Sequence, residues 1–96
     1  MGTGIHKAIR LHPDDNVVVC IQTLQAREEI LIAGNIATMA NTIGIGHKLA
    51  CKHIRQGEAI IKYGVPIGVA TENICPGAHV HSHNMKSSYI ETYLIQ

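Results

Sequence analysis

Phenylalanine and tryptophan are absent from this sequence, and tyrosine, at Tyr63, Tyr89 and Tyr93, is its only aromatic residue. Proteins that bind single-stranded nucleic acid by base stacking need more aromatic side chains than this. The net charge is only +1 with histidine counted as neutral. The excess of lysine and arginine that nucleic acids and anionic membranes require is therefore missing as well. The composition argues against both as partners.

Long apolar runs are also missing, since none reaches the roughly 18 residues of a membrane-spanning helix. The N-terminal stretch MGTGIHKAIRLHPDD lacks the apolar segment of a secretion signal. Cys20, Cys51 and Cys75 are odd in number and show no CxxC spacing, which favours packed thiols in a reducing compartment over a disulfide framework. We therefore expect a cytoplasmic protein without a membrane span.

What the chain does contain is enough for one domain, residues 1–96, and too little for two. Apolar residues, almost all of them Ile, Val, Leu and Ala, make up 46% of the sequence, which is typical of a folded chain. Seven histidines are the outlier in the composition, and imidazoles change charge near neutral pH. A domain this small buries only a modest fraction of its surface, so a partner would add stability.

The first half of the chain does not indicate a single type of secondary structure. Residues 8–22, AIRLHPDDNVVVCIQ, predict strand, turn and strand, because turn-forming residues separate two apolar runs. The continuous run Val17–Ile21 is typical of a strand buried on both faces. Residues 24–30, LQAREEI, are helix-prone but too short for a stable free helix, so we expect one or two helical turns or a surface connection. Residues 31–48 are compatible with strand and with loop.

The second half carries a weak internal repeat. The segments HIRQGEAIIKYG and NICPGAHVHSHN share a frame at an offset of twenty residues. The frame consists of Ile54, Gly57 and Ile60 in the first copy and Ile74, Gly77 and Val80 in the second. Pro76-Gly77 suits the central positions of a type II turn, in which glycine takes a positive φ, and Gln56-Gly57 can do the same. The repeat predicts a compact, turn-rich β domain.

The segment GAHVHSHN holds His79, His81, His83 and Asn84. If residues 78–84 are extended, the imidazoles share one face, while Val80 and Ser82 take the other and Val80 faces the core. Imidazoles two residues apart on a strand are roughly 6.5–7 Å apart, so a twist or bulge and ligands from elsewhere are needed to complete a metal site. A solvated, histidine-rich edge strand is the alternative.

Two further motifs could carry chemistry. GIGHKLAC places His47 and Lys48 at the start of an expected strand, where an imidazole and an ammonium can hold a carboxylate; exposed edge residues are the alternative. IIKYGVPIG places Lys62 and Tyr63 before a rigid turn, and spacing alone does not decide whether Lys62 has a function. No nucleophile–base pair or carboxylate pair is recognisable in the sequence, which indicates a binding or accessory domain.

The succession GHK, then I..GE.IIKYG.PIG.AT..I..G.HVH.HN, runs from Gly46 to Asn84 and resembles the small N-terminal module of the altronate and galactarate dehydratase family. It is also similar to the small subunit of sulfolactate sulfo-lyase. The first 45 residues match only loosely, through DNVVVCIQTL, and the family often has a glycine where this chain has LQAREE. The resemblance implies a mainly β, SAF-type β-clip domain with long turns and at most one or two short helical turns.

The same resemblance implies a function. The main catalytic machinery would lie on a large catalytic subunit or a C-terminal dehydratase domain, and the enzyme would eliminate water, or sulfite in the sulfo-lyase branch, from a hydroxy or sugar acid. The dehydratases of this family depend on a divalent metal, typically Fe²⁺. Catalytic roles would fall to His81 and His83, and metal contacts to these two and His79, although the family often has another residue at position 79.

The substrate contacts implied by the motif are His47, Lys48, Lys62, Tyr63 and Asn84. We expect the chain alone to be inactive, and the sequence admits a homo-oligomer. The alternative is a stand-alone SAF-type binding module without a catalytic role.

Overall fold

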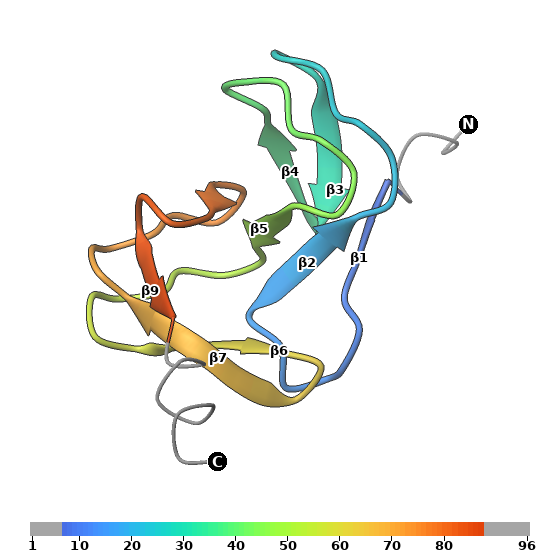
Figure 1. Cartoon of the computed structure of the whole chain (residues 1–96). Helices are drawn as coiled ribbons and strands as arrows, with labels where there is room; N and C mark the ends of the chain where they lie inside the picture. The colour runs from blue at the N-terminus through green and yellow to red at the C-terminus, as the bar shows by residue number, and fades with distance from the viewer. Residues whose placement is uncertain (1–6, 88–96) are drawn as a thin grey trace.

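The computed structural model describes residues 7–87 and shows an all-β arrangement without a helix in that range (Figure 1). The strands are β1 Ala8–Ile9, β2 Val17–Cys20, β3 Glu29–Ile32, β4 Asn35–Thr38, β5 Lys48–Ala50, β6 Ala59–Lys62, β7 Val65–Ala70, β8 His79–Val80 and β9 Met85–Ser87. No helix long and apolar enough to cross a membrane occurs in the described residues. The predicted mainly β fold class is confirmed. For residues 24–30 the helical alternative is wrong: Leu24 is buried, residues 25–28 form an exposed turn, and Glu29 and Ile30 begin β3.

The strands form three antiparallel sheets. A four-stranded sheet has the order β1-β2-β5-β8, the hairpin β3-β4 stands alone, and β6, β7 and β9 form a three-stranded sheet. In the four-stranded sheet, β2 pairs with β5 in a register that places Val18 opposite Leu49. Figure 1 shows the two hairpins, β3-β4 and β6-β7, on different sides of this sheet. The predicted strand, turn and strand over residues 8–22 are thus confirmed as β1 and β2.

Strand β2 separates two hydrophobic cores. Val18 and Leu49 belong to the core that contains residues of the β3-β4 hairpin, whereas Val17 and Ala50 belong to the core that contains residues of β6 and β7. Alternate residues of a strand point to opposite faces, so both faces of β2 are covered. This confirms the prediction, made from the β-branched run, of a strand buried on both sides.

The frame detected twice in the sequence occurs four times in the structure. Each copy has an apolar anchor, a turn residue three positions later and a buried apolar residue three positions after that. The copies are Leu24/Arg27/Ile30, Ile43/Gly46/Leu49, Ile54/Gly57/Ile60 and Ile74/Gly77/Val80. The anchors pair within each half of the chain as isolated bridges, Leu24 with Ile43 and Ile54 with Ile74. The domain is therefore built from two similar units that share strands β2 and β5.

The turns within these frames have one geometry. Each is closed by a backbone hydrogen bond from its fourth to its first residue, and its third residue has a positive φ, at 87° for Gly46, 89° for Gly57 and 86° for Gly77. This is the type II turn predicted for Gln56-Gly57 and Pro76-Gly77. Cys75 is the first residue of the last turn and is exposed, so the expectation that it is a packed thiol is wrong.

Arg27 occupies the glycine position of the first turn, with a φ of 71°. A side chain in this left-handed region costs about 1 kcal/mol or more. We expect Arg27→Gly to raise the free energy of unfolding by about 0.5–1 kcal/mol, after the greater flexibility of the unfolded glycine chain is subtracted. Urea unfolding measures the change. The matched control is Gly57→Ala, which should lower stability, because a Cβ there meets no atom within 4 Å and only the φ penalty acts.

The hairpin between β6 and β7 is fixed by a buried carboxylate. Tyr63 and Gly64 form its two-residue turn with φ values of 61° and 74°, as type I′ turns require. Asp15, only 1% exposed, accepts hydrogen bonds from the backbone N–H groups of Tyr63 at 2.9 Å and Gly64 at 2.8 Å. Burial raises the pKa of Asp15, but these two hydrogen bonds and the nearby His12 outweigh it and leave the pKa below its ordinary value.

Asn16 ties the same loop to strand β6. Its side-chain amide donates to the carbonyl of Ala59 at 2.8 Å, and its side-chain oxygen accepts from the backbone N–H of Ile61 at 2.8 Å. The sequence predicted only a turn at residues 13–16, and the structure shows that two of these polar residues are buried, at Asp15 and Asn16.

Candidate functional site

Three histidines from two neighbouring strands and the adjoining loops converge at one end of the four-stranded sheet. His47 precedes β5, His79 lies in β8, and His81 follows β8. Because β5 pairs with β8, with Leu49 opposite His79, these side chains meet. His47 Nδ1 lies 2.9 Å from His79 Nε2, and one ring nitrogen from each of the three residues lies within 4.8 Å of the others. We call His47, His79 and His81 the histidine cluster.

The rings pack against each other as well. Those of His79 and His81 are stacked, with centroids 5.4 Å apart and an interplanar angle of 6°. The His83 ring lies beside the cluster, 5.7 Å from that of His79. The structure therefore brings together two of the three histidines predicted as metal contacts, His79 and His81, and adds His47 to them, whereas His83 lies outside this set. Whether any of them binds metal or takes part in catalysis remains a prediction.

The backbone conformation that brings the histidines together differs from the predicted one. Only His79 and Val80 are in strand β8, and residues 81–84 form a turn, so the prediction of an extended segment over residues 78–84 is wrong beyond Val80. Val80 is fully buried, as predicted, but Ser82 is exposed on the turn instead of sharing the face of Val80. The turn, rather than strand alternation, brings His81 back towards His79.

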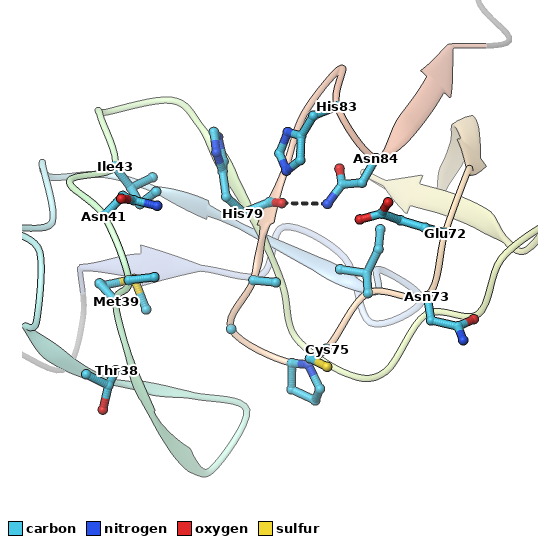
Figure 2. Close-up of a pocket in the computed structure, with 15 residues that line it drawn as sticks. Thr38, Met39, Asn41, Ile43, Glu72, Asn73, Cys75, His79, His83 and Asn84 are labelled. Carbon is cyan, nitrogen blue, oxygen red and sulfur yellow. Dashed lines mark hydrogen bonds between the residues drawn. The ribbon is translucent and has the colours of Figure 1, made fainter.

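Asn84 closes this turn. It is 3% exposed, its side-chain oxygen accepts from the backbone N–H of His81 at 2.9 Å, and its amide donates to the carbonyl of His79 at 2.8 Å (Figure 2). The backbone N–H of Asn84 also donates to the carbonyl of His81. The structure thus gives Asn84 a positioning role, while its predicted substrate contact is untested.

Positive charge surrounds the histidine cluster. Burial lowers the pKa of His79, and the positive charges of its neighbours lower it further. These neighbours are His47, His81, His83 and Lys48. Burial also lowers the pKa of Lys48, and the charge of Lys62 adds to this effect. These charges oppose protonation of His79, and positively charged groups such as Lys48 attract anions.

The remaining predicted substrate contacts lie at three different places in the fold. Lys48 begins β5, directly after His47, and Lys62 ends β6. Tyr63 stands at the tip of the β6-β7 hairpin with 67% of its surface exposed. The structure thus confirms that His47 and Lys48 stand at a strand entrance and that Lys62 and Tyr63 lead into a tight turn.

A groove of about 440 Å³ opens beside the histidines. One wall is the connection after β4, residues 38–43, and the other is residues 72–77, with His79 and His83 between them at one end (Figure 2). This groove could not be predicted from the sequence, because Thr38, Asn41 and Glu72 belong to no motif. Its two walls come together through the pairing of β5 with β8, which no local pattern indicates.

The architecture defines a class of protein. It is a small β domain of paired type II turns around a shared sheet, with imidazole and ammonium groups gathered at one end. A family model described as the altronate/galactarate dehydratase SAF domain matches residues 6–88, and the chain belongs to this family. The predicted resemblance to this family is confirmed by the match.

Two of the relatives are much longer than this chain. It is 35% identical over 86 residues to an altronate dehydratase of Bacillus subtilis, covering 90% of this chain and 17% of that protein. It is 38% identical over 80 residues to an altronate dehydratase of Escherichia coli, covering 83% of this chain and 16% of that protein. The alpha subunit of (2R)-sulfolactate sulfo-lyase from Chromohalobacter salexigens is 47% identical over 47 residues, which cover 49% of this chain and 50% of that subunit. The chain thus spans about a sixth of the altronate dehydratases.

Proposed function

We propose that this chain is the small subunit or N-terminal domain of a sugar-acid dehydratase or related hydroxy-acid lyase, and that its histidine cluster lies in an active site completed by a large catalytic part. The observation that carries the proposal is the convergence of His47, His79 and His81, with ring nitrogens within 4.8 Å of each other. Family membership supports it, as does the small share of the altronate dehydratases that the chain spans.

Elimination from a hydroxy acid needs a base for the proton next to the carboxylate, an acid or metal for the leaving group, and cations for the anionic intermediate. The lowered pKa of His79 keeps this imidazole neutral and able to accept a proton. Lys48 and Lys62 supply positive charge for the substrate carboxylate. His81, in the cluster, and His83, beside it, are both exposed and would transfer protons to a bound acid.

A divalent metal fits the donor set. Neutral imidazoles bind zinc, nickel and iron, and the burial that lowers the pKa of His79 favours its neutral, metal-binding form. Two nitrogens bound to one ion are roughly 3 Å apart, and His47 Nδ1 and His79 Nε2 are 2.9 Å apart. The cluster contains no carboxylate, so oxygen ligands would come from substrate or partner. When bound, Fe²⁺ would polarise a substrate oxygen as a Lewis acid.

Metal binding can be tested on the chain itself. We expect weak uptake of zinc at neutral pH, which falls as acidification protonates the imidazoles. In calorimetric titrations, His81→Ala should weaken zinc binding by about tenfold or more. His53→Ala, an exposed histidine outside the cluster, should not change it. Tight binding that survives His81→Ala would place the metal elsewhere on the chain.

The alternative function is a stand-alone SAF-type binding module without a catalytic role. The two functions predict different effects on turnover when a large catalytic part is added. Assayed with Fe²⁺ and altronate, galactarate or sulfolactate, the chain alone should show no turnover, and addition of the proposed large catalytic part should produce turnover. Robust turnover by the isolated chain would contradict the accessory role, and a lack of turnover by the mixture would favour the stand-alone module.

A further inference from the structure

The longest stretch of the chain without a charged side chain forms most of the β3-β4 hairpin and the connection that follows it. Residues 30–46 contain no lysine, arginine, aspartate or glutamate, and ten of these seventeen residues are exposed. On a surface that faces water, about a quarter or more of the residues usually carry a charge. The centres of protein–protein interfaces, by contrast, are depleted of charge. We call the exposed residues of this stretch the uncharged surface.

Apolar side chains stand on the outer face of the hairpin. Ile30 and Ile32 are buried in the core, so Leu31 between them points to the opposite face. Leu31 pairs across the hairpin with Ile36, which is 66% exposed. The solvent face of an antiparallel sheet is normally polar, and edge strands are normally protected by charges or proline. Strand β4 has neither, and β3 is its one strand partner among residues 7–87. These are the features of a strand that a partner covers.

The hairpin of the second unit, β6-β7, differs in this respect. It also exposes apolar side chains, among them Val65 and Val69. However, Lys62 lies opposite Val65, and Lys86 lies opposite Val69 in the register of that sheet. Apolar residues scattered among charges are normal on a surface that stays in water. Because the two units are built on the same frame, the lack of charge is a property of the first hairpin and not a requirement of the fold.

The uncharged surface borders the histidine cluster at two points. Ile45, which is 66% exposed, lies two residues before His47, in the turn that His47 closes. Thr38 and Asn41 line the groove together with His79 (Figure 2). A partner that covers this surface would therefore also reach the imidazoles.

We propose that the uncharged surface, with Ile36 and Ile45 as its apolar contacts, is where the large catalytic part of the enzyme docks on this chain. The inference rests on the proposed function, which requires that part to complete the site at the histidine cluster. A second copy of the chain at this surface would occupy the place of the large part. Since the surface has no charge to pair, the matching face of the large part should be apolar and uncharged as well.

The test is a titration of the large catalytic part with the chain, in which turnover reports the assembled enzyme. Ile36→Asp and Ile45→Asn should each raise the concentration of chain that gives half-maximal turnover by about tenfold or more, because a charged or polar group would be buried without a partner. Turnover of Ile36→Asp at saturating concentration should return to the wild-type value. Ile36→Thr keeps a β-branched side chain that suits a strand and should raise the half-maximal concentration by about threefold.

The matched control is Val69→Asp, which places a carboxylate at an exposed strand position of the second hairpin and should leave the half-maximal concentration unchanged. Urea unfolding checks the fold of each variant, and sedimentation of the chain alone measures its self-association. If Ile36→Thr and Ile45→Asn give the wild-type half-maximal concentration, the inference is overturned while the proposed function stands. A dimer of the chain alone that Ile36→Asp converts to a monomer would assign the surface to a second copy and also overturn it. If the wild-type mixture shows no turnover, the proposed function fails, and the inference fails with it.

Discussion

Replacing His81 with alanine is expected to lower the turnover number of the assembled dehydratase by about 100-fold or more. Loss of a group that transfers a proton or binds a catalytic metal has effects of this order. His81 belongs to the cluster with His47 and His79, yet its side chain is exposed and the bonds that hold the turn use its backbone. The substitution should therefore lower the turnover number while leaving the fold intact. His83→Ala should lower turnover for the same reason.

Steady-state kinetics of the chain combined with its large catalytic part would measure this loss, and urea unfolding of each variant would test for an intact fold. His53→Ala supplies the matched control, since it removes an exposed imidazole outside the cluster. Wild-type kinetics in both His81→Ala and His83→Ala would show that these imidazoles are solvated and take no part in the reaction. A large fall in stability that parallels the loss of rate would assign them to the fold instead.

Asp15→Ala is expected to lower the free energy of unfolding by about 3 kcal/mol, out of the 5–15 kcal/mol typical of small domains. The substitution leaves the backbone N–H groups of Tyr63 and Gly64 without the carboxylate that accepts their hydrogen bonds. The ring of His12 lies against Gly64, so the hairpin turn cannot easily relax to bind water. By contrast, Asp14→Ala removes a carboxylate that is 75% exposed and should change stability by about 0.5 kcal/mol or less.

The pH dependence of stability gives an independent check on Asp15. Its pKa in the folded chain is below the ordinary value, which is about 3.9 in unfolded chains. The stabilisation is therefore complete above about pH 4 and is lost as the pH falls through the folded pKa. Urea unfolding of the wild type and of Asp15→Ala should differ most at neutral pH and converge in acid. A difference that stays constant down to pH 2 would show that the carboxylate charge contributes nothing.

Two of the four turns could be predicted from the sequence, because glycine readily takes the positive φ of a type II turn; the turn at Gly46 was not predicted, although it also has glycine at this position. Gly57 and Gly77 indicated their turns through spacing alone. The first turn escaped prediction because Arg27 stands where glycine would have marked it, and the helix propensity of the surrounding residues suggested a helical turn instead. Packing of the anchors Leu24 and Ile43 against each other outweighs that local preference.

The histidine cluster could be predicted only in part. The alternation of His79, His81 and His83 was visible in the sequence, but the 2.9 Å approach of His47 to His79 was not. These two residues are 32 positions apart, and pairing of β5 with β8 brings them together. Strand pairing of this kind depends on the whole sheet, so no local pattern indicates it. The burial of Asp15 could not be predicted for a similar reason, because its hydrogen-bond donors lie 48 and 49 residues away in the sequence.

The sharing of β2 and β5 between two hydrophobic cores has a consequence for how the domain opens. Val18 and Leu49 serve one core while Val17 and Ala50 serve the other, so loss of either core exposes a face of the same two strands. We therefore expect the two units to unfold together, in one cooperative transition. Amide protons in β2 and β5 then exchange with solvent only through global unfolding. His47 and His79, which depend on the β5-β8 pairing, keep their geometry until the whole domain unfolds.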